Sequence, residues 1–266
     1  MRTPIVVAIA SLCSVGLIAG CSSSTKGKGD PGSPSGQSSS TSSSNSTASS
    51  PNSSAPSGGQ TLSASERQKL ESDVAAAMGA TTSFHMVGAG KDDDGSKLQF
   101  DIHFGPNKKV DGTIVTHGET TKVINSGDGS IYFMAPDSEW KQEGGGAAVA
   151  VFHGKWAKAP VDDKRFSSLS ETFNKDAFIK ELTSSDDNSD DLRKVGPAIV
   201  DGTPATQYAS ASDHSVIFIA ASGPPLLLKG GTLPDGLLAF TDYNKDYPFA
   251  APPAAQTVDI SKLGGN

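Results

Sequence analysis

The chain has 266 residues with 22 basic and 29 acidic side chains, a formal net charge of −7. Three basic residues and one acidic residue precede Gln60, which leaves 19 basic and 28 acidic residues after that point. This balance argues against a nucleic-acid partner, which requires a basic surface. Both cysteines, Cys13 and Cys21, precede Gln60, so the rest of the chain can form neither a disulfide nor a cysteine-ligated metal site.

The N-terminus has the pattern of an export signal. Arg2 supplies a positive charge, and an apolar run over residues 5–18 leads to Cys21. This run is shorter than the about 20 residues that a membrane-spanning helix needs, so residues 1–20 are predicted to be a signal peptide. The sequence Leu17-Ile18-Ala19-Gly20-Cys21 resembles the bacterial lipobox, which implies lipid attachment at Cys21. Two or more acyl chains anchor a protein stably. The alternative is an ordinary signal cleaved elsewhere, with Cys21 incidental.

Residues 22–59 consist almost entirely of Ser, Thr, Gly, Pro and Asn, with two alanines and no larger apolar side chain. Such a segment cannot bury enough apolar surface to offset the entropy of ordering it. We therefore expect residues 21–59 to be a lipidated cysteine followed by a disordered tether. The tether would hold a single domain, residues 60–266, next to a membrane.

The domain is predicted to begin with a helix over residues 64–78, because Ser63 and Glu66 have capping-box spacing and Gly79 can end the helix. Strands follow. The clearest covers residues 98–104, where every second residue is apolar. Further strands are predicted over residues 84–88, 110–116, 120–125 and 130–134. Polar or glycine-containing turns separate them, including Asp94-Gly95. The pattern indicates an antiparallel meander with one solvated face.

The middle of the chain is predicted to be helical, and the last third to return to strands. Trp140 is expected to end the meander, and three glycines at 144–146 precede a short helix over residues 147–152. A second helix is predicted over residues 168–183, with a capping box at its start. Later strands are predicted over residues 192–200, 205–211, 216–220, 226–229, 237–243 and 257–260. No boundary interrupts residues 60–266, which favours one α+β domain.

Several short stretches, in this order, resemble the actinobacterial lipoproteins of the LolA/LppX/LprG type. They are Ile131-Tyr132-Phe133 before Trp140, Gly154-Lys155-Trp156, Val200 to Pro204, Phe218 to Pro225, Phe240 to Tyr243, Ala251 to Pro253 and Val258 to Leu263. The lipobox and the Ser-rich tether before them also match, and within the domain the resemblance covers essentially all of residues 62–263. It implies one strongly curved antiparallel half-barrel with helices packed on its concave face. Characterised members hold acyl chains between sheet and helices, and carry lipids or lipoproteins across the cell envelope.

A sheet with one apolar face must bury that face. Here only a few short helices are available to cover it, which leaves room for an incompletely filled apolar cavity. The predicted lining consists of Leu98, Phe100, Ile102, Phe104, Val110, Ile114, Ile131, Phe133, Phe173 and Phe178. The alternative is a dry core made of the same side chains. Likewise, the glycines at 144–146 are either the hinge of a lid or simply a loop.

The sequence predicts neither a catalytic site nor a metal site. No G-x-S-x-G motif occurs. The five histidines are scattered and form no H-x-x-x-H or H-E-x-x-H pair. They are His85, His103, His117, His153 and His214. His103 falls on the polar side of its strand, which indicates a solvated residue. The acidic runs at 92–94 and 186–191 lack the pattern of an EF-hand loop and are interpreted as solvated loops.

We therefore expect a non-enzymatic lipoprotein without a cofactor, held to the outer face of the cytoplasmic membrane through Cys21. It would bind an acyl lipid or another hydrophobic ligand in an apolar cavity. Whether it also carries that ligand is left open. The alternative is an envelope adaptor that binds a protein partner through its outer surface. A hydrolase is the third hypothesis.

Overall fold

The computed structural model describes residues 59–91, 95–166, 173–183, 191–212 and 214–263. Several predictions fall outside these residues and stay predictions. They concern the signal peptide, lipid attachment at Cys21, the tether, the capping box at 168–171 and the acidic runs at 92–94 and 186–190.

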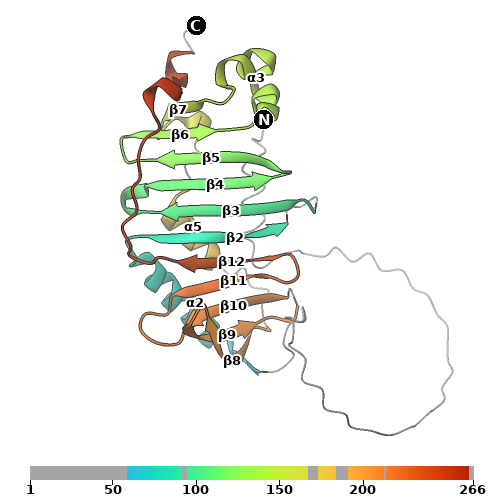
Figure 1. Cartoon of the computed structure of the whole chain (residues 1–266). Helices are drawn as coiled ribbons and strands as arrows, with labels where there is room; N and C mark the ends of the chain where they lie inside the picture. The colour runs from blue at the N-terminus through green and yellow to red at the C-terminus, as the bar shows by residue number, and fades with distance from the viewer. Residues whose placement is uncertain (1–58, 92–94, 167–172, 184–190, 213, 264–266) are drawn as a thin grey trace, which may run out of the picture.

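The described chain forms one sheet with the strand order β1-β8-β9-β10-β11-β12-β2-β3-β4-β5-β6-β7-β13 (Figure 1). The first seven strands are β1 (Gln60–Thr61), β2 (Phe84–Lys91), β3 (Lys97–Phe104), β4 (Val110–Thr116), β5 (Glu119–Asn125), β6 (Ser130–Met134) and β7 (Trp156–Pro160). The others are β8 (Arg193–Val200), β9 (Thr203–Ala209), β10 (Ser215–Ala220), β11 (Leu227–Thr232), β12 (Gly236–Thr241) and β13 (Thr257–Asp259). Neighbours pair antiparallel except β13 and β7, which are parallel. Within the described residues, β1 and β13 each have one neighbour, so the sheet is open.

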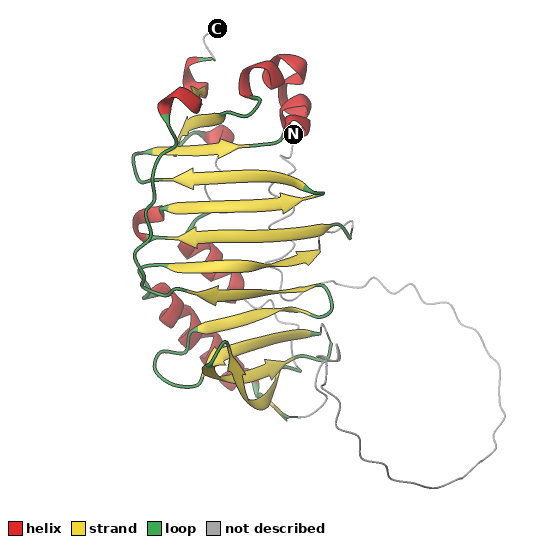
Figure 2. Ribbon diagram, viewed as in Figure 1, coloured by secondary structure: helices red, strands yellow, loops and turns green. Residues whose placement is uncertain are grey.

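Three α-helices accompany the sheet in the part of the chain that the structure describes. They are α2 (Ala64–Gly79), α3 (Asp137–Phe152) and α5 (Lys175–Thr183). Figure 2 shows α2 and α5 behind the sheet and α3 at the end where β6 and β7 lie. No helix in the described part of the chain is both long and apolar enough to cross a membrane. The predicted α+β fold, with one large antiparallel sheet and few helices, is confirmed.

The helix predicted first is α2, and its capping box is present. The Glu66 backbone N–H donates to Ser63 Oγ at 3.4 Å, and the Ser63 N–H donates to Glu66 Oε2 at 2.8 Å. Val74 and Met78 are the buried side chains of this helix. They join the core on the side of the sheet that faces the helices.

The sheet has an inner face, toward the helices, and an outer face. On β3 the alternation is confirmed: Leu98, Phe100, Ile102 and Phe104 are buried, while Gln99 and Asp101 are exposed and His103 is half-buried. The outer face carries a small apolar cluster of its own, made by Ile124, Tyr132 and Trp156. After β12, residues 242–256 run along the strand ends to β13 (Figure 1); we call this stretch the C-terminal segment.

The middle of the chain differs from the prediction. Trp140 does not end the meander but lies in α3, whose first half was not predicted. Residues 156–160 form β7 instead of a connection. The helix predicted over residues 168–183 is described only in its second part, α5, which begins at Lys175 because Asn174 caps it; residues 168–172 lie outside the described residues. The Asn174 Oδ1 accepts from the backbone N–H of Asp176 at 2.9 Å and of Ala177 at 3.3 Å.

Candidate functional site

All ten predicted lining residues lie in one hydrophobic core between sheet and helices. Each is at most 6% exposed. Eight come from the inner faces of β3, β4 and β6, while Phe173 precedes α5 and Phe178 lies within it. The sequence pattern thus identified one contiguous set of apolar side chains. Their role as a ligand-binding surface stays a prediction.

Aromatic rings fill both ends of this interior. Under α5, the ring centroid of Phe104 lies 4.9 Å from that of Phe84 and 5.3 Å from that of Phe178. Under α3, the Trp140 ring lies 5.6 Å from Phe133 and 4.3 Å from Phe152. Such separations are those of directly packed rings. A ligand at either of these two places would have to displace side chains or a helix.

Gly112 makes a notch in the inner face of β4, between Val110 and Ile114. A Cβ atom at this position would lie 3.2 Å from Phe173 Cε1 and 3.2 Å from Ile102 Cγ1. Phe173 therefore occupies the space that a side chain at position 112 would take. It is also the one predicted lining residue outside every helix and strand. These contacts make Phe173 a side chain whose displacement would open space against the sheet.

Helix α3 covers the other end of the interior in two pieces. Gly145 has a φ of 65° and Gly144 a φ of −146°, so the helical backbone is interrupted there. A positive φ costs glycine little because it has no Cβ atom. Trp140 of the first piece stacks on Phe152 of the second, so both pieces contact the core. A lid hinged at these glycines stays a prediction.

The first piece of α3 carries a carboxyl group with a shifted pKa. Burial, followed by the charges of Glu119 and Glu143, raises the pKa of Glu139 to about 7. Nearby, Ser138 and Lys141 have the S-x-x-K spacing of some acylating serine enzymes. The Ser138 hydroxyl, however, donates to Glu119 Oε2 at 2.6 Å and so has a carboxylate partner.

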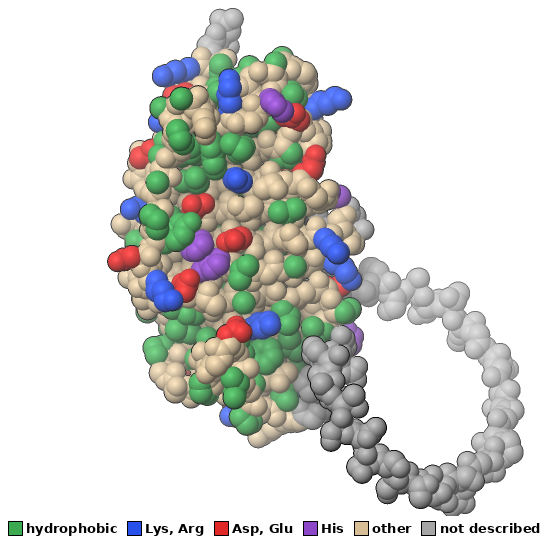
Figure 3. All heavy atoms as spheres, in the orientation of Figure 1, with side chains coloured by type: hydrophobic (Ala, Val, Ile, Leu, Met, Phe, Trp, Pro, Cys, Tyr) green, Lys and Arg blue, Asp and Glu red, His purple; other side chains and the backbone are tan. Residues whose placement is uncertain are grey.

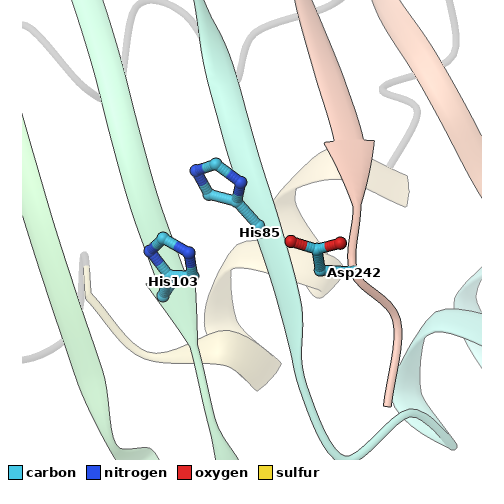
Figure 4. Close-up of side chains that lie close together, drawn as sticks. All are labelled: His85, His103 and Asp242. Atoms are coloured by element: carbon cyan, nitrogen blue, oxygen red, sulfur yellow. The ribbon is translucent and has the colours of Figure 1, made fainter. Parts of the chain in front are cut away.

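The outer face brings together residues that the sequence analysis left scattered. His85 on β2 lies directly opposite His103 on β3, and their rings stack at 3.9 Å with planes 5° apart. Asp242 follows β12, the other neighbour of β2. Figure 3 shows two adjacent histidine side chains on this helix-free face, with acidic side chains close to them. Figure 4 shows His85 between His103 and Asp242.

The C-terminal segment covers part of this cluster. The Tyr247 ring stacks on the other side of His103 at 3.8 Å, and the Tyr247 hydroxyl donates to Asp111 Oδ2 at 3.2 Å. Burial, followed by the charge of His85, lowers the pKa of His103. The predicted solvated His103 is thus half-buried between two rings. A lowered pKa favours the neutral imidazole, which is the form that binds metal ions.

A small pocket of about 80 Å³ lies beside His103, Asp242 and Tyr247. Binding sites for small organic ligands usually measure about 300–1,000 Å³, so this pocket does not suit an acyl chain. It has room for about two water molecules, at roughly 30 Å³ each. The apolar interior and the outer-face cluster are therefore two separate candidate sites.

No family model matches the chain, and no curated protein sequence matches it either. Solved structures with a similar fold include the lipoprotein LppX of Mycobacterium tuberculosis, which is 16% identical. That match covers 71% of this chain and 100% of LppX, with a TM-score of 0.40. LppX belongs to the type of lipoprotein that the sequence resembles.

LprF of Mycobacterium bovis is 10% identical over 74% of this chain and 100% of LprF, with a TM-score of 0.43. A chain of the MucA/MucB complex of Pseudomonas aeruginosa is 17% identical to this chain. That match covers 71% of this chain and 59% of the chain in the complex, with a TM-score of 0.28. At these values the likeness is one of general fold. It assigns neither a ligand nor a partner to this chain.

Proposed function

We propose that the chain is an extracytoplasmic lipoprotein, anchored through acyl chains on Cys21 to the outer face of the cytoplasmic membrane. In this proposal the domain binds an acyl lipid or another hydrophobic ligand between sheet and helices. The observation that carries it is the inner face. A continuous apolar surface extends from Leu227 on β11 across β12 and β2 to β6 and on to Ala157 on β7, with only three α-helices described over it.

The size of this apolar surface matters because α5, one of the helices that cover it, is short. Helix α5 has 9 residues and contributes Phe178 and Ile179 to the core. Burial of an acyl chain gains about 0.8 kcal/mol for each CH₂ group, so a chain of ordinary length can offset the displacement of one or two aromatic side chains. Phe173, over the notch at Gly112, is the side chain that we expect a ligand to replace first.

The test uses the full chain with Cys21→Ser, so that no attached acyl chain competes, and a fluorescent fatty-acid probe. We expect the probe to bind in the interior and Phe173→Ala to increase its affinity, because the substitution empties the space over Gly112. Phe249→Ala is the matched control, since Phe249 packs against Gly105 and Tyr247 in the C-terminal segment. If neither the parent nor Phe173→Ala binds the probe, the lipid-binding proposal fails. A stable complex with an envelope protein would then favour the adaptor hypothesis.

The anchor is tested separately by membrane fractionation of the full-length protein. Cys21→Ser should move it from the membrane fraction to the soluble fraction, because lipid attachment needs the Cys21 thiol. Cys13→Ser is the control and should stay in the membrane fraction, since residue 13 lies in the predicted signal peptide. Membrane association that survives Cys21→Ser would contradict the proposed anchor without bearing on the interior.

A further inference from the structure

We propose that His85, His103 and Asp242 form a binding site for a divalent transition-metal ion such as Zn²⁺ on the outer face of the sheet. One nitrogen of each imidazole and one carboxylate oxygen lie within 4.8 Å of one another (Figure 4). Among the described residues, this is the one group of three His, Cys, Asp or Glu side chains with that geometry. The site is independent of the lipid-binding proposal.

The donor set selects the class of metal. Zinc takes histidine nitrogen and carboxylate oxygen ligands, and imidazole suits Zn²⁺, Cu²⁺ and Ni²⁺ better than the hard ions Mg²⁺ and Ca²⁺. Three protein ligands leave a fourth tetrahedral position to water.

A fourth side chain orients His85 for this role. The Nε2 atom of His85 lies 2.8 Å from Asp101 Oδ1. Because a carboxylate only accepts, this hydrogen bond uses a proton on Nε2, which leaves Nδ1 as the nitrogen to ligate the metal. A carboxylate behind a ligating histidine is the usual arrangement in metal sites, where it sets the tautomer and the ring orientation. Asp101 is therefore a positioning residue.

Binding requires small movements of the three ligand side chains. Ligands of one tetrahedral zinc ion lie roughly 3.4 Å apart, given Zn–N distances of about 2.0–2.1 Å, so the three atoms have to approach one another by about 1.4 Å at most. The imidazole planes are 5° from parallel, so one ring must also turn before both nitrogens face the same ion. Turning His103 breaks its stack on Tyr247.

Lys245 competes with the metal for Asp242. Its Nζ lies 2.7 Å from Asp242 Oδ1, and the Lys245 side chain is 71% exposed. An exposed ion pair of this kind contributes little free energy, so a divalent cation can replace it. A bound metal would cross-link β2 and β3 to the start of the C-terminal segment, and so stabilise the folded state in proportion to its occupancy.

The experiment is isothermal titration calorimetry of the full chain with ZnCl₂, using Cys13→Ser with Cys21→Ser so that no thiol binds the metal. We expect one equivalent of Zn²⁺ to bind, a higher melting temperature with Zn²⁺ than with Mg²⁺, and shifted NMR signals of the Tyr247 ring. His103→Gln and Asp242→Asn should abolish this binding. Asparagine suits the positive φ of 55° at position 242, so Asp242→Asn keeps the backbone.

Three further variants make the result specific. His153→Gln removes an exposed histidine paired with Asp137, far along the chain from the site, and should bind Zn²⁺ like the parent. Asp101→Asn should weaken binding about 10- to 100-fold, as loss of an orienting carboxylate does. Lys245→Gln should strengthen Zn²⁺ binding, because it removes the side chain that competes for Asp242. The proposal is overturned if the parent binds no Zn²⁺, or if its affinity is unchanged in both His103→Gln and Asp242→Asn.

Discussion

The two faces of β2 and β3 are made by alternate residues of the same strands, yet they differ in kind. On the inner face, Phe84 and Phe104 stand opposite each other and pack beneath α5. One residue away, His85 and His103 stand opposite each other on the outer face and stack in contact with Tyr247. The phenylalanine pair belongs to an interior whose stability depends on the apolar area that it buries. The proposed role of the histidine pair depends on where a few polar atoms lie.

The largest difference between the faces should appear in stability. Phe104 is 1% exposed and contacts two other rings, so Phe104→Ala should lower the free energy of unfolding by about 3–5 kcal/mol. His103→Ala, next to it on the outer face, should cost about 1 kcal/mol or less in metal-free buffer. Chemical denaturation of both variants in the Cys21→Ser background measures the two values. Equal losses would contradict the division of the sheet into a structural inner face and an outer face with a separate role.

A smaller and pH-dependent effect should appear at the end covered by α3. The pKa of Glu139 is raised to about 7 from an ordinary value of 4.5. Between these two pH values the folded protein keeps a proton that the unfolded chain has lost, so this group makes stability fall as pH rises through the window. Above pH 7 the folded protein bears the full free-energy cost of a charged Glu139, and below pH 4.5 this cost vanishes.

Glu139→Gln should therefore raise the free energy of unfolding at pH 8, by about 1–2 kcal/mol after allowance for solvent screening of a half-buried group. At pH 4 the variant and the parent should have equal stability, which makes the low-pH measurement the internal control. A gain at pH 4 as large as that at pH 8 would mean that Glu139→Gln acts through packing and not through its charge.

Sequence reasoning succeeded where a local pattern decides the structure. The alternation of Leu98, Phe100, Ile102 and Phe104 gave both the strand and its buried face, because one side of a half-buried strand must be apolar. The capping box at Ser63 likewise located the start of α2. Phe173 and Phe178 were placed in the right core even though α5 begins later than predicted.

The outer-face cluster was missed because it depends on register between strands. All pairs of the β2–β3 hairpin are centred on position 94, so His85 faces His103. A two-residue turn at Asp94-Gly95 would instead be centred between these two residues and would set His85 opposite Phe104. The predicted turn was therefore wrong in register by one residue and did not bring the two histidines together. Asp242 is different, since the pairing of β12 with β2 joins distant parts of the chain.

The elements of the middle region were missed for local reasons. Strand β7 has two alanines and ends in a proline, so it lacks the β-branched pattern of its neighbours. The first piece of α3 is short and runs into three glycines, which have low helix propensity. How tightly the interior is packed, which decides between a dry core and a cavity, depends on side-chain contacts that no periodicity encodes.

The most direct test of the account is the lipid content of the protein itself. The full chain with Cys21→Ser, expressed in a bacterial envelope and purified without detergent, is analysed intact by native mass spectrometry and then extracted with organic solvent. The account predicts a population carrying one non-covalent acyl lipid, which is lost on extraction and is more abundant in Phe173→Ala than in Phe249→Ala. A protein that is always free of lipid, and remains so after incubation with vesicles, would contradict it.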